Sequence, residues 1–296
     1  RRECHLRADV HAPFTDHRPS RSGHEGVAGH GDDHLGGIGL HVEGAVGGVA
    51  GVAGLVRGLD QLGGGELVLE LELDRHPARH AHLLTDRRDD DLDRIAVTGR
   101  KFRHVLDLSS ISEPEAVEYA YRFVKPAGTL CPAVISAGGE TFMVYVLDRA
   151  GRISNVITGN KCASGTGEFF LQQLRRMDVT LAEAAQWALV EKPYRVSGRC
   201  SVFCKSDCTH ATNKGVPKSA VTAGLCHMMA DKILELLKKV PRRDIMLTGG
   251  TARNQMMTEC LHRKIPGLIV PAEAPYFEAL GAALWAAELG NNPVTT

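Results

Sequence analysis

Apolar and polar residues follow an ordered pattern only after about residue 95 of the 296-residue chain. From there, runs with the two-residue period of strands alternate with runs that have the longer period of helices. The predicted strands are residues 95–97, 133–136, 141–148, 153–158, 245–248 and 268–270. The predicted helices are residues 113–124, 165–177, 180–189, 202–213, 218–239, 254–263 and 276–289. Strands that alternate with helices in this way predict an α/β layered fold.

The first 100 residues differ in composition from the rest of the chain. They carry 12 basic and 17 acidic residues and contain no Lys, Asn, Met, Tyr or Trp, although Lys is common in ordinary domains. Only residues 66–73 alternate like a strand. Because this composition is typical of GC-rich DNA translated out of frame, we hypothesise that residues 1–94 are an anomalous segment, disordered or frameshifted. The functional domain is then expected at residues 95–296.

Overall charge and hydrophobicity exclude several classes of protein. The 35 basic and 35 acidic residues balance, whereas a nucleic-acid-binding protein usually shows a basic stripe. No run of 18 or more apolar residues is present, so we expect no membrane span. Seven of the eight cysteines follow residue 130, and clustered cysteines in a chain of this size indicate metal or redox chemistry. We expect a soluble, cytoplasmic protein with neither nucleic acid nor membrane as a partner.

Three glycine-rich turns lie where a predicted strand ends and the next element begins, at residues 136–141, 162–167 and 247–251. Glycine lets backbone N–H groups approach a phosphate closely, and a helix N-terminus favours an anion. One such turn is a weak signal, but three in one α/β unit favour a nucleotide site.

Two cysteines stand at predicted helix starts. Cys162 precedes Gly165-Thr166-Gly167, and Cys200 begins the run CSVFCKSDC. An iron–sulfur cluster bound by thiolates is anionic, and two helix N-termini directed at it would stabilise its reduced state. Cys204 and Cys208 fall on the same helix face as Cys200 and are either further ligands or small core residues.

The other cysteines give weaker signals. Cys131, Cys226 and Cys260 stand singly among apolar residues, which predicts that they lie in the core. A structural zinc site at residues 200–210 is a second interpretation, although the usual Cys-x-x-Cys pair is missing.

Four motifs carry a resemblance to a known family: NKCASGTGEFF at 160–170, RCSVF at 199–203, LTGGT at 247–251 and ALGAAL at 279–284. Over about residues 95–296 the chain resembles the ATP-dependent activators of 2-hydroxyacyl-CoA dehydratases and the ATPase subunits of benzoyl-CoA reductase. The resemblance implies an actin-like, ribonuclease-H-type ATPase that forms a homodimer. It also implies one [4Fe–4S] cluster between the subunits, with Cys162 and Cys200 as each chain's ligands. Cys204, on the same predicted helix face as Cys200, is a possible extra ligand from its spacing alone.

The same resemblance implies ATP and Mg²⁺ as further cofactors. An electron from ferredoxin or flavodoxin would pass, on ATP hydrolysis, to a partner iron–sulfur dehydratase or reductase. The residues expected to bind the nucleotide lie in or beside the glycine turns: Gly138, Gly139, Thr141, Gly165, Thr166, Gly167, Gly249, Gly250, Thr251 and Asn254.

The chain also departs from the family pattern. The first phosphate loop, an Asp-x-Gly-Ser hairpin, should precede residue 95, but nothing in residues 1–94 matches it, so the first β-hairpin is expected to be missing or replaced. The second loop usually opens on Asp and carries Gln, where this chain has Ser136 and Glu140. Glu140 is the candidate catalytic residue, as a group that orients the attacking water or accepts its proton. Without the first loop, Mg²⁺ and the terminal phosphates lose ligands, and ATP hydrolysis is expected to be impaired.

Two other functions remain open from the sequence. A sugar or carboxylate kinase of the same fold would not depend on the cysteines. A non-enzymatic protein stabilised by zinc would use Cys200, Cys204, Cys208 and a histidine such as His210.

Overall fold

The computed structural model describes the backbone of residues 40–44, 52–57, 66–71, 94–99, 109–159, 165–187 and 192–289, and side chains within these ranges from residue 96 onward. Strands and helices alternate along the chain, which confirms the predicted α/β fold. In the described part of the chain, no helix has both the length and the apolar character that a membrane crossing needs.

The central sheet carries the best-defined part of the fold. Its strands are β5 (Ala133–Ala137), β6 (Phe142–Leu147), β7 (Ile153–Thr158) and β8 (Met246–Thr248). Their order is β7-β6-β5-β8, with β5 antiparallel to β6 and parallel to β8. All five residues of β5 are buried, as expected for a strand that has neighbours on both sides and helices on both faces.

The strand predicted at residues 268–270 is reduced to a single parallel bridge between Met246 and Ile269. Gly267 precedes this run and Pro271 follows it. Because proline has no N–H to donate, the strand pairing with Met246 does not extend beyond this single bridge.

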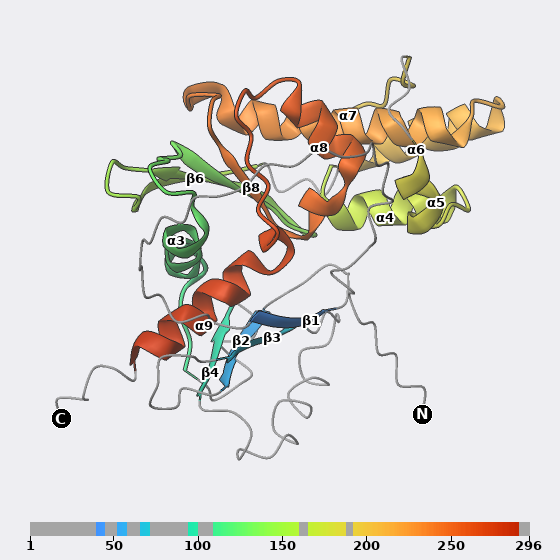
Figure 1. Cartoon of the computed structure of the whole chain (residues 1–296). Coiled ribbons are helices and arrows are strands. Elements are labelled where there is room, and N and C mark those ends of the chain that lie inside the picture. The colour runs from blue at the N-terminus through green and yellow to red at the C-terminus, as the bar shows by residue number, and fades with distance from the viewer. Residues whose placement is uncertain are drawn as a thin grey trace, which may run out of the picture.

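Helices cover both faces of the central sheet (Figure 1). One face carries α4 (Gly167–Arg176), α5 (Leu181–Gln186), α6 (Ser201–Asn213), α7 (Lys218–Leu236) and α8 (Gln255–His262). The other face carries α3 (Glu113–Val124) and α9 (Phe277–Leu289). Alternate residues of β5 divide between the two cores, with Ile135 facing the first group and Val134 the second.

The helix boundaries follow local capping signals. Thr180 and Glu183 form the predicted capping box, with the Glu183 amide donating to Thr180 Oγ1 at 3.1 Å. Helix α4 begins at Gly167 and not at the predicted Gly165, because Gly165 has φ of +92°, outside the helical region. Helix α7 ends at Leu236 and continues into a 3₁₀ turn through Lys239.

A second sheet has the order β1-β3-β2-β4. Its strands are β1 (Leu40–Gly44), β2 (Val52–Arg57), β3 (Glu66–Leu71) and β4 (Arg94–Thr98). The predicted strands at residues 66–73 and 95–97 are confirmed as β3 and β4, but β1 and β2 were missed. Strand β1 (LHVEG) alternates apolar and polar residues, but only over four positions, and β2 (VAGLVR) does not alternate; backbone pairing forms β1 against β3, and β2 against β3 and β4. None of the three upstream strand sequences contains an Asp-x-Gly-Ser pattern, and the division of the chain at residue 95 stays a prediction.

Helix α9 connects the two sheets. It contacts α3 on one side and β2 and β4 on the other (Figure 1). A side chain at Gly281 would collide with the backbone of Ala116, so the two helices approach as closely as glycine allows.

Candidate functional site

The three glycine turns predicted from the sequence meet at one point of the fold. The Gly138 carbonyl accepts hydrogen bonds from Thr251 Oγ1 at 3.0 Å and from the Gly167 amide at 3.3 Å. The next carbonyl, that of Gly139, accepts from the Glu168 amide at 2.9 Å. Residues far apart in sequence thus form a single backbone junction where β5 ends and α4 begins. We call it the glycine junction.

The two glycines after β8 have different surroundings. Gly249 is buried, has φ of +90°, and a Cβ there would lie 2.5 Å from the Ala137 carbonyl oxygen. Gly250 is exposed, and nothing lies within 4 Å of the position of its Cβ. Gly249 is therefore required by the fold, whereas Gly250 borders open space in which a ligand could approach the backbone.

The other residues predicted to bind the nucleotide differ in their exposure to solvent. Glu140 and Thr141 are exposed at the tip of the β5–β6 turn, and Thr166 is buried directly before α4. Asn254 caps α8, because its Oδ1 accepts the Met257 amide at 3.1 Å. This structural use of Asn254 was missed, although Asn before a helix is a common N-cap.

A carboxyl group at the start of α9 was also missed. Ser136 Oγ donates to Glu278 Oε1 at 2.8 Å, two residues before Gly138. Burial raises the pKa of Glu278, and the hydrogen bond from Ser136 acts in the opposite direction. The signal that could have found it is an acidic residue in the first turn of a buried, alanine-rich helix.

Cys200 is the N-cap residue of α6. Its carbonyl accepts the Cys204 amide at 3.0 Å, and its thiol makes no capping hydrogen bond. The side chain is half-buried, and the next apolar residues, Val202 and Phe203, are 69% and 62% exposed. The thiol therefore lies at an open, positively polarised helix end with uncovered apolar neighbours. Its predicted companion Cys162 lies outside the described residues.

The remaining cysteines of the described chain are enclosed. Cys131, Cys226 and Cys260 lie in the core as predicted, and burial raises the pKa of Cys226 to about 12. Cys204 and Cys208 are at most 2% exposed. A hydrogen bond with Cys208, together with burial, raises the pKa of Cys204.

The zinc site considered at residues 200–210 is not formed. Among the described residues, which include all four of its proposed ligands, no three His, Cys, Asp or Glu side chains gather as a metal site would need. The physical reason is helix geometry, since a rise of about 1.5 Å per residue separates Cys200 from Cys208 by roughly 12 Å along the axis.

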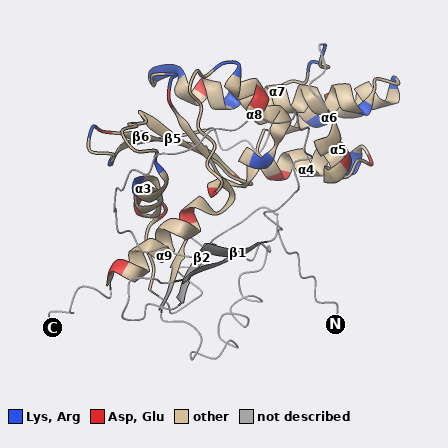
Figure 2. Cartoon of the chain, in the orientation of Figure 1, with Lys and Arg blue, Asp and Glu red and all other residues tan. Residues whose placement is uncertain are grey.

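A pocket of about 440 Å³ lies between α4 and the start of α6. Its lining includes Phe169, Arg176, Val202 and Lys205. Over the wider surface, charges of both signs are spread across helices α7 and α8 and form no basic stripe in this view (Figure 2).

Comparisons with known proteins agree with this geometry. The chain is 27% identical over 201 residues to the 2-hydroxyisocaproyl-CoA dehydratase activator of Clostridioides difficile, covering 67% of this chain and 74% of that protein. It is 31% identical over 156 residues to the (R)-2-hydroxyglutaryl-CoA dehydratase activating ATPase of Acidaminococcus fermentans, covering 52% of this chain and 60% of that protein.

A solved structure shows the same fold. The activator of the 2-hydroxyisocaproyl-CoA dehydratase from Clostridium difficile, with bound ADPNP, superposes with a TM-score of 0.68 at 24% identity, over 86% of this chain and 98% of that one. The likeness confirms the predicted actin-like α/β fold. The family model of the BadF/BadG/BcrA/BcrD ATPases matches residues 105–286, and the chain therefore belongs to the BadF/BadG/BcrA/BcrD ATPase family.

Proposed function

We propose that this protein is an ATP-dependent activator that delivers a low-potential electron to an iron–sulfur acyl-CoA dehydratase or reductase. The observation that carries the proposal is Cys200 at the open start of α6, in a fold whose glycine turns converge on the helix that follows Cys162. The matched relatives are themselves described as activators of acyl-CoA dehydratases.

A [4Fe–4S] cluster fits the residues around Cys200. A thiolate is the ligand such clusters use, and the α6 N-terminus offers backbone N–H groups and a favourable dipole to an anion. Gly165, three residues after Cys162, has φ of +92°, and a Cβ there would collide with Lys232 of α7, so the backbone approaches α7 closely at this residue. The donor set of one chain, Cys162 and Cys200, supplies half of the four thiolates required.

A homodimer would complete the ligand set. Twofold symmetry is the commonest arrangement of soluble oligomers, and it would bring two Cys200 thiols to one axis. Val202 and Phe203 are exposed beside Cys200, and a subunit contact there would remove their apolar surface from water. Cys204, enclosed behind them, would join the cluster only after a local rearrangement of α6.

The glycine junction is the proposed binding site for ATP. The phosphates would approach the open side of Gly250 and the turn at residues 138–141, whose Glu140 and Thr141 are exposed. The Gly138 N–H is not available to them, because it donates to the Thr141 carbonyl at 3.0 Å. Mg²⁺, when bound, would neutralise phosphate charge. Glu140, exposed at the tip of that turn, would orient the attacking water or accept its proton.

The covalent path between the two proposed sites is short. Gly167 and Glu168 donate to the carbonyls of the β5–β6 turn, and Cys162 lies only five residues before Gly167. A change at the nucleotide would therefore move the start of α4 and the cysteine loop together. This connection supports the proposal that ATP alters the cluster's surroundings and its electron transfer from ferredoxin or flavodoxin.

Anaerobic reconstitution with iron and sulfide tests the proposed function. We expect one reducible [4Fe–4S] cluster per dimer, detected by electron paramagnetic resonance and by four iron atoms for two chains. Cys162→Ala and Cys200→Ala should each abolish it, while Cys260→Ala, in the core, should retain it. A cluster that survives both ligand substitutions would refute the assignment and leave a cysteine-independent kinase as the better candidate.

A further inference from the structure

The pocket between α4 and α6 is lined by one face of each helix. Phe169 and Gln173, four residues apart, come from α4, and Val202 and Lys205, three residues apart, come from α6. Its volume of about 440 Å³ is in the range of small-molecule sites. Among the described residues, none that forms the glycine junction lines it, so the pocket is separate from the proposed nucleotide site.

The lining includes a buried hydrogen-bond acceptor that lacks a donor. Gln173 is 1% exposed, and Phe169, which precedes it by one helical turn, is 5% exposed. Within the part of the chain that the structure describes, no donor reaches Gln173 Oε1. Proteins rarely leave a buried amide oxygen unpaired, because it has given up its hydrogen bonds to water. A bound group that carries an N–H or O–H would satisfy this atom.

Positive charge borders the same pocket. Arg175, Arg176 and Lys205 are exposed lining residues, and the described lining contains no Asp or Glu. Arg176 Nη2 donates to Thr209 Oγ1 at 3.3 Å, which joins α4 to α6. None of the three cations forms an ion pair within the described ranges. The pocket therefore offers three positive charges that no carboxylate of the described chain neutralises.

The two helices do not supply the missing negative charge. The acidic residue of α4, Glu168, accepts from Gln172 Nε2 at 3.3 Å, and that of α6, Asp207, accepts the Ser197 amide at 2.8 Å. Helix α6 has no acidic residue in its first turn and no side-chain cap. Because the first N–H groups of a helix carry partial positive charge, the start of α6 adds to the attraction for an anion.

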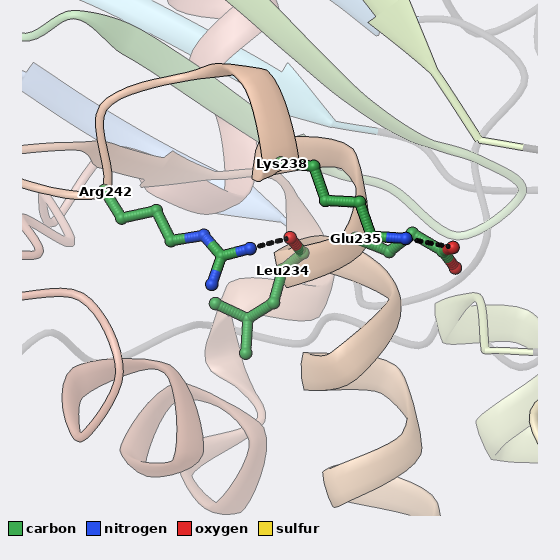
Figure 3. Close-up of polar contacts among 4 residues, drawn as sticks. All are labelled: Leu234, Glu235, Lys238 and Arg242. Atoms are coloured by element: carbon green, nitrogen blue, oxygen red, sulfur yellow. Dashed lines mark hydrogen bonds and ion pairs between the residues drawn. The ribbon is translucent and has the colours of Figure 1, made fainter.

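Cations near the end of α7 are placed differently. Lys238 pairs with Glu235 at 3.0 Å, and Arg242 donates to the Leu234 carbonyl at 3.0 Å (Figure 3). These side chains have acceptors within the protein itself. The comparison makes the pocket between α4 and α6 the place where charge and an unpaired acceptor together indicate a ligand.

We propose that this pocket binds a phosphate monoester whose organic group is flat or apolar and carries an N–H or O–H donor. The phosphate, with a charge of about −1.5 to −2 at pH 7, pairs with Lys205 and with the forked guanidinium groups. The organic group packs against Phe169 and Val202, and its donor meets Gln173 Oε1. A carboxylate carries a single charge and matches three cations less well. The site requires neither cluster nor ATP and goes beyond the proposed function.

Isothermal titration calorimetry of the full chain with two matched probes tests the site. 4-Aminophenyl phosphate carries the anion, the flat ring and an N–H donor, whereas phenyl phosphate lacks only the donor. We expect the first probe to bind about tenfold more tightly, because only its amine satisfies Gln173 Oε1. Inorganic phosphate, which has no organic group, should bind more weakly than either probe.

Three variants assign the binding to this pocket. Gln173→Met keeps the approximate size of the side chain and should abolish the difference between the two probes. Lys205→Met should weaken the binding of both probes about tenfold through the lost charged contact. Lys238→Met is the matched control, because it removes the charge of a lysine that pairs with Glu235 and does not line the pocket. It should bind both probes as the wild type does.

Each other outcome contradicts the proposal. If neither probe binds saturably, the pocket is not a phosphate-ester site. If both bind but neither Gln173→Met nor Lys205→Met changes their affinity, they bind elsewhere, for example at the glycine junction. Lys205 is exposed, so Lys205→Met decides the location even if Gln173→Met fails to fold. Equal affinity of the wild type for the two probes would refute the role of Gln173. Cluster reconstitution is measured separately, so none of these failures touches the proposed function.

Discussion

The start of α6 and the layer between α7 and α8 both hold cysteines, but they expose them in opposite ways. Cys200 is half-buried at a helix end beside exposed Val202 and Phe203. Cys226 and Cys260 lie at most 5% exposed among packed apolar side chains. The difference shows that residue type alone does not mark a ligand, because a thiolate needs an environment that stabilises its negative charge.

Alkylation should give the largest contrast between the two regions. Burial raises the pKa of Cys226 to about 12, so its reactive thiolate is scarce at pH 8 and its side chain is closed to the reagent, whereas the Cys200 side chain is half-buried at a helix end. We expect iodoacetamide to label Cys200 of the metal-free protein at least about a thousandfold faster than Cys226. Peptide mapping by mass spectrometry measures both rates, and similar rates in the folded protein would contradict the contrast.

Gly224 tests the contact that joins the two regions. A Cβ there would collide with the Tyr194 carbonyl, in the segment that leads to Cys200. We expect Gly224→Ala to reduce the free energy of unfolding by about 3 kcal/mol and to lower cluster occupancy. Gly215→Ala is the control, because that site has φ of +77° but open space, and it should cost only about 1 kcal/mol. Equal losses in urea denaturation would show that the backbone contact is unimportant.

Substitutions of Cys204 and Cys200 should differ in their effect on the free energy of unfolding, because only Cys204 is enclosed in the core. Cys204 is fully buried, so we expect Cys204→Ala to cost about 1 to 2 kcal/mol of unfolding free energy through the cavity it leaves. Cys200→Ala removes a half-exposed thiol and should change the stability of the metal-free protein by less than about 0.5 kcal/mol. A larger loss of unfolding free energy in Cys200→Ala than in Cys204→Ala, measured by thermal or chemical denaturation, would contradict this difference between the two cysteines.

Glu278 shows whether burial controls a carboxyl group as it controls the core thiols. Burial raises its pKa, so the folded state holds this proton more tightly than the unfolded chain. Its contribution to stability is present below the unfolded pKa and is lost as the pH rises through the folded pKa. Glu278→Gln keeps an acceptor for Ser136, and we expect it to flatten the fall in unfolding free energy over that range. An unchanged pH profile would contradict the shift.

Local sequence was sufficient for much of the fold. The helix at residues 113–124 and the strand at 153–158 were predicted with their observed bounds, because capping residues and alternation act over a few positions. Strand β1 was missed because its alternation covers only four residues, and β2 because its pairing with β3 and β4 does not depend on alternation of its own sequence. The strand at 268–270 was overpredicted because Pro271 ends the short apolar run, which leaves a single bridge between Met246 and Ile269.

For the candidate site, the sequence by itself determined the chemistry: which cysteines stand at helix starts and which turns are rich in glycine. Only the tertiary structure decided which of those groups meet. The Gly138 carbonyl joins two other glycine turns, one of them 113 residues away, and the side chain of Lys232 on α7 lies against both Gly165 and Gly198. Neither contact can be recognised from a local sequence pattern, because both depend on how elements distant in the sequence pack against each other in the core.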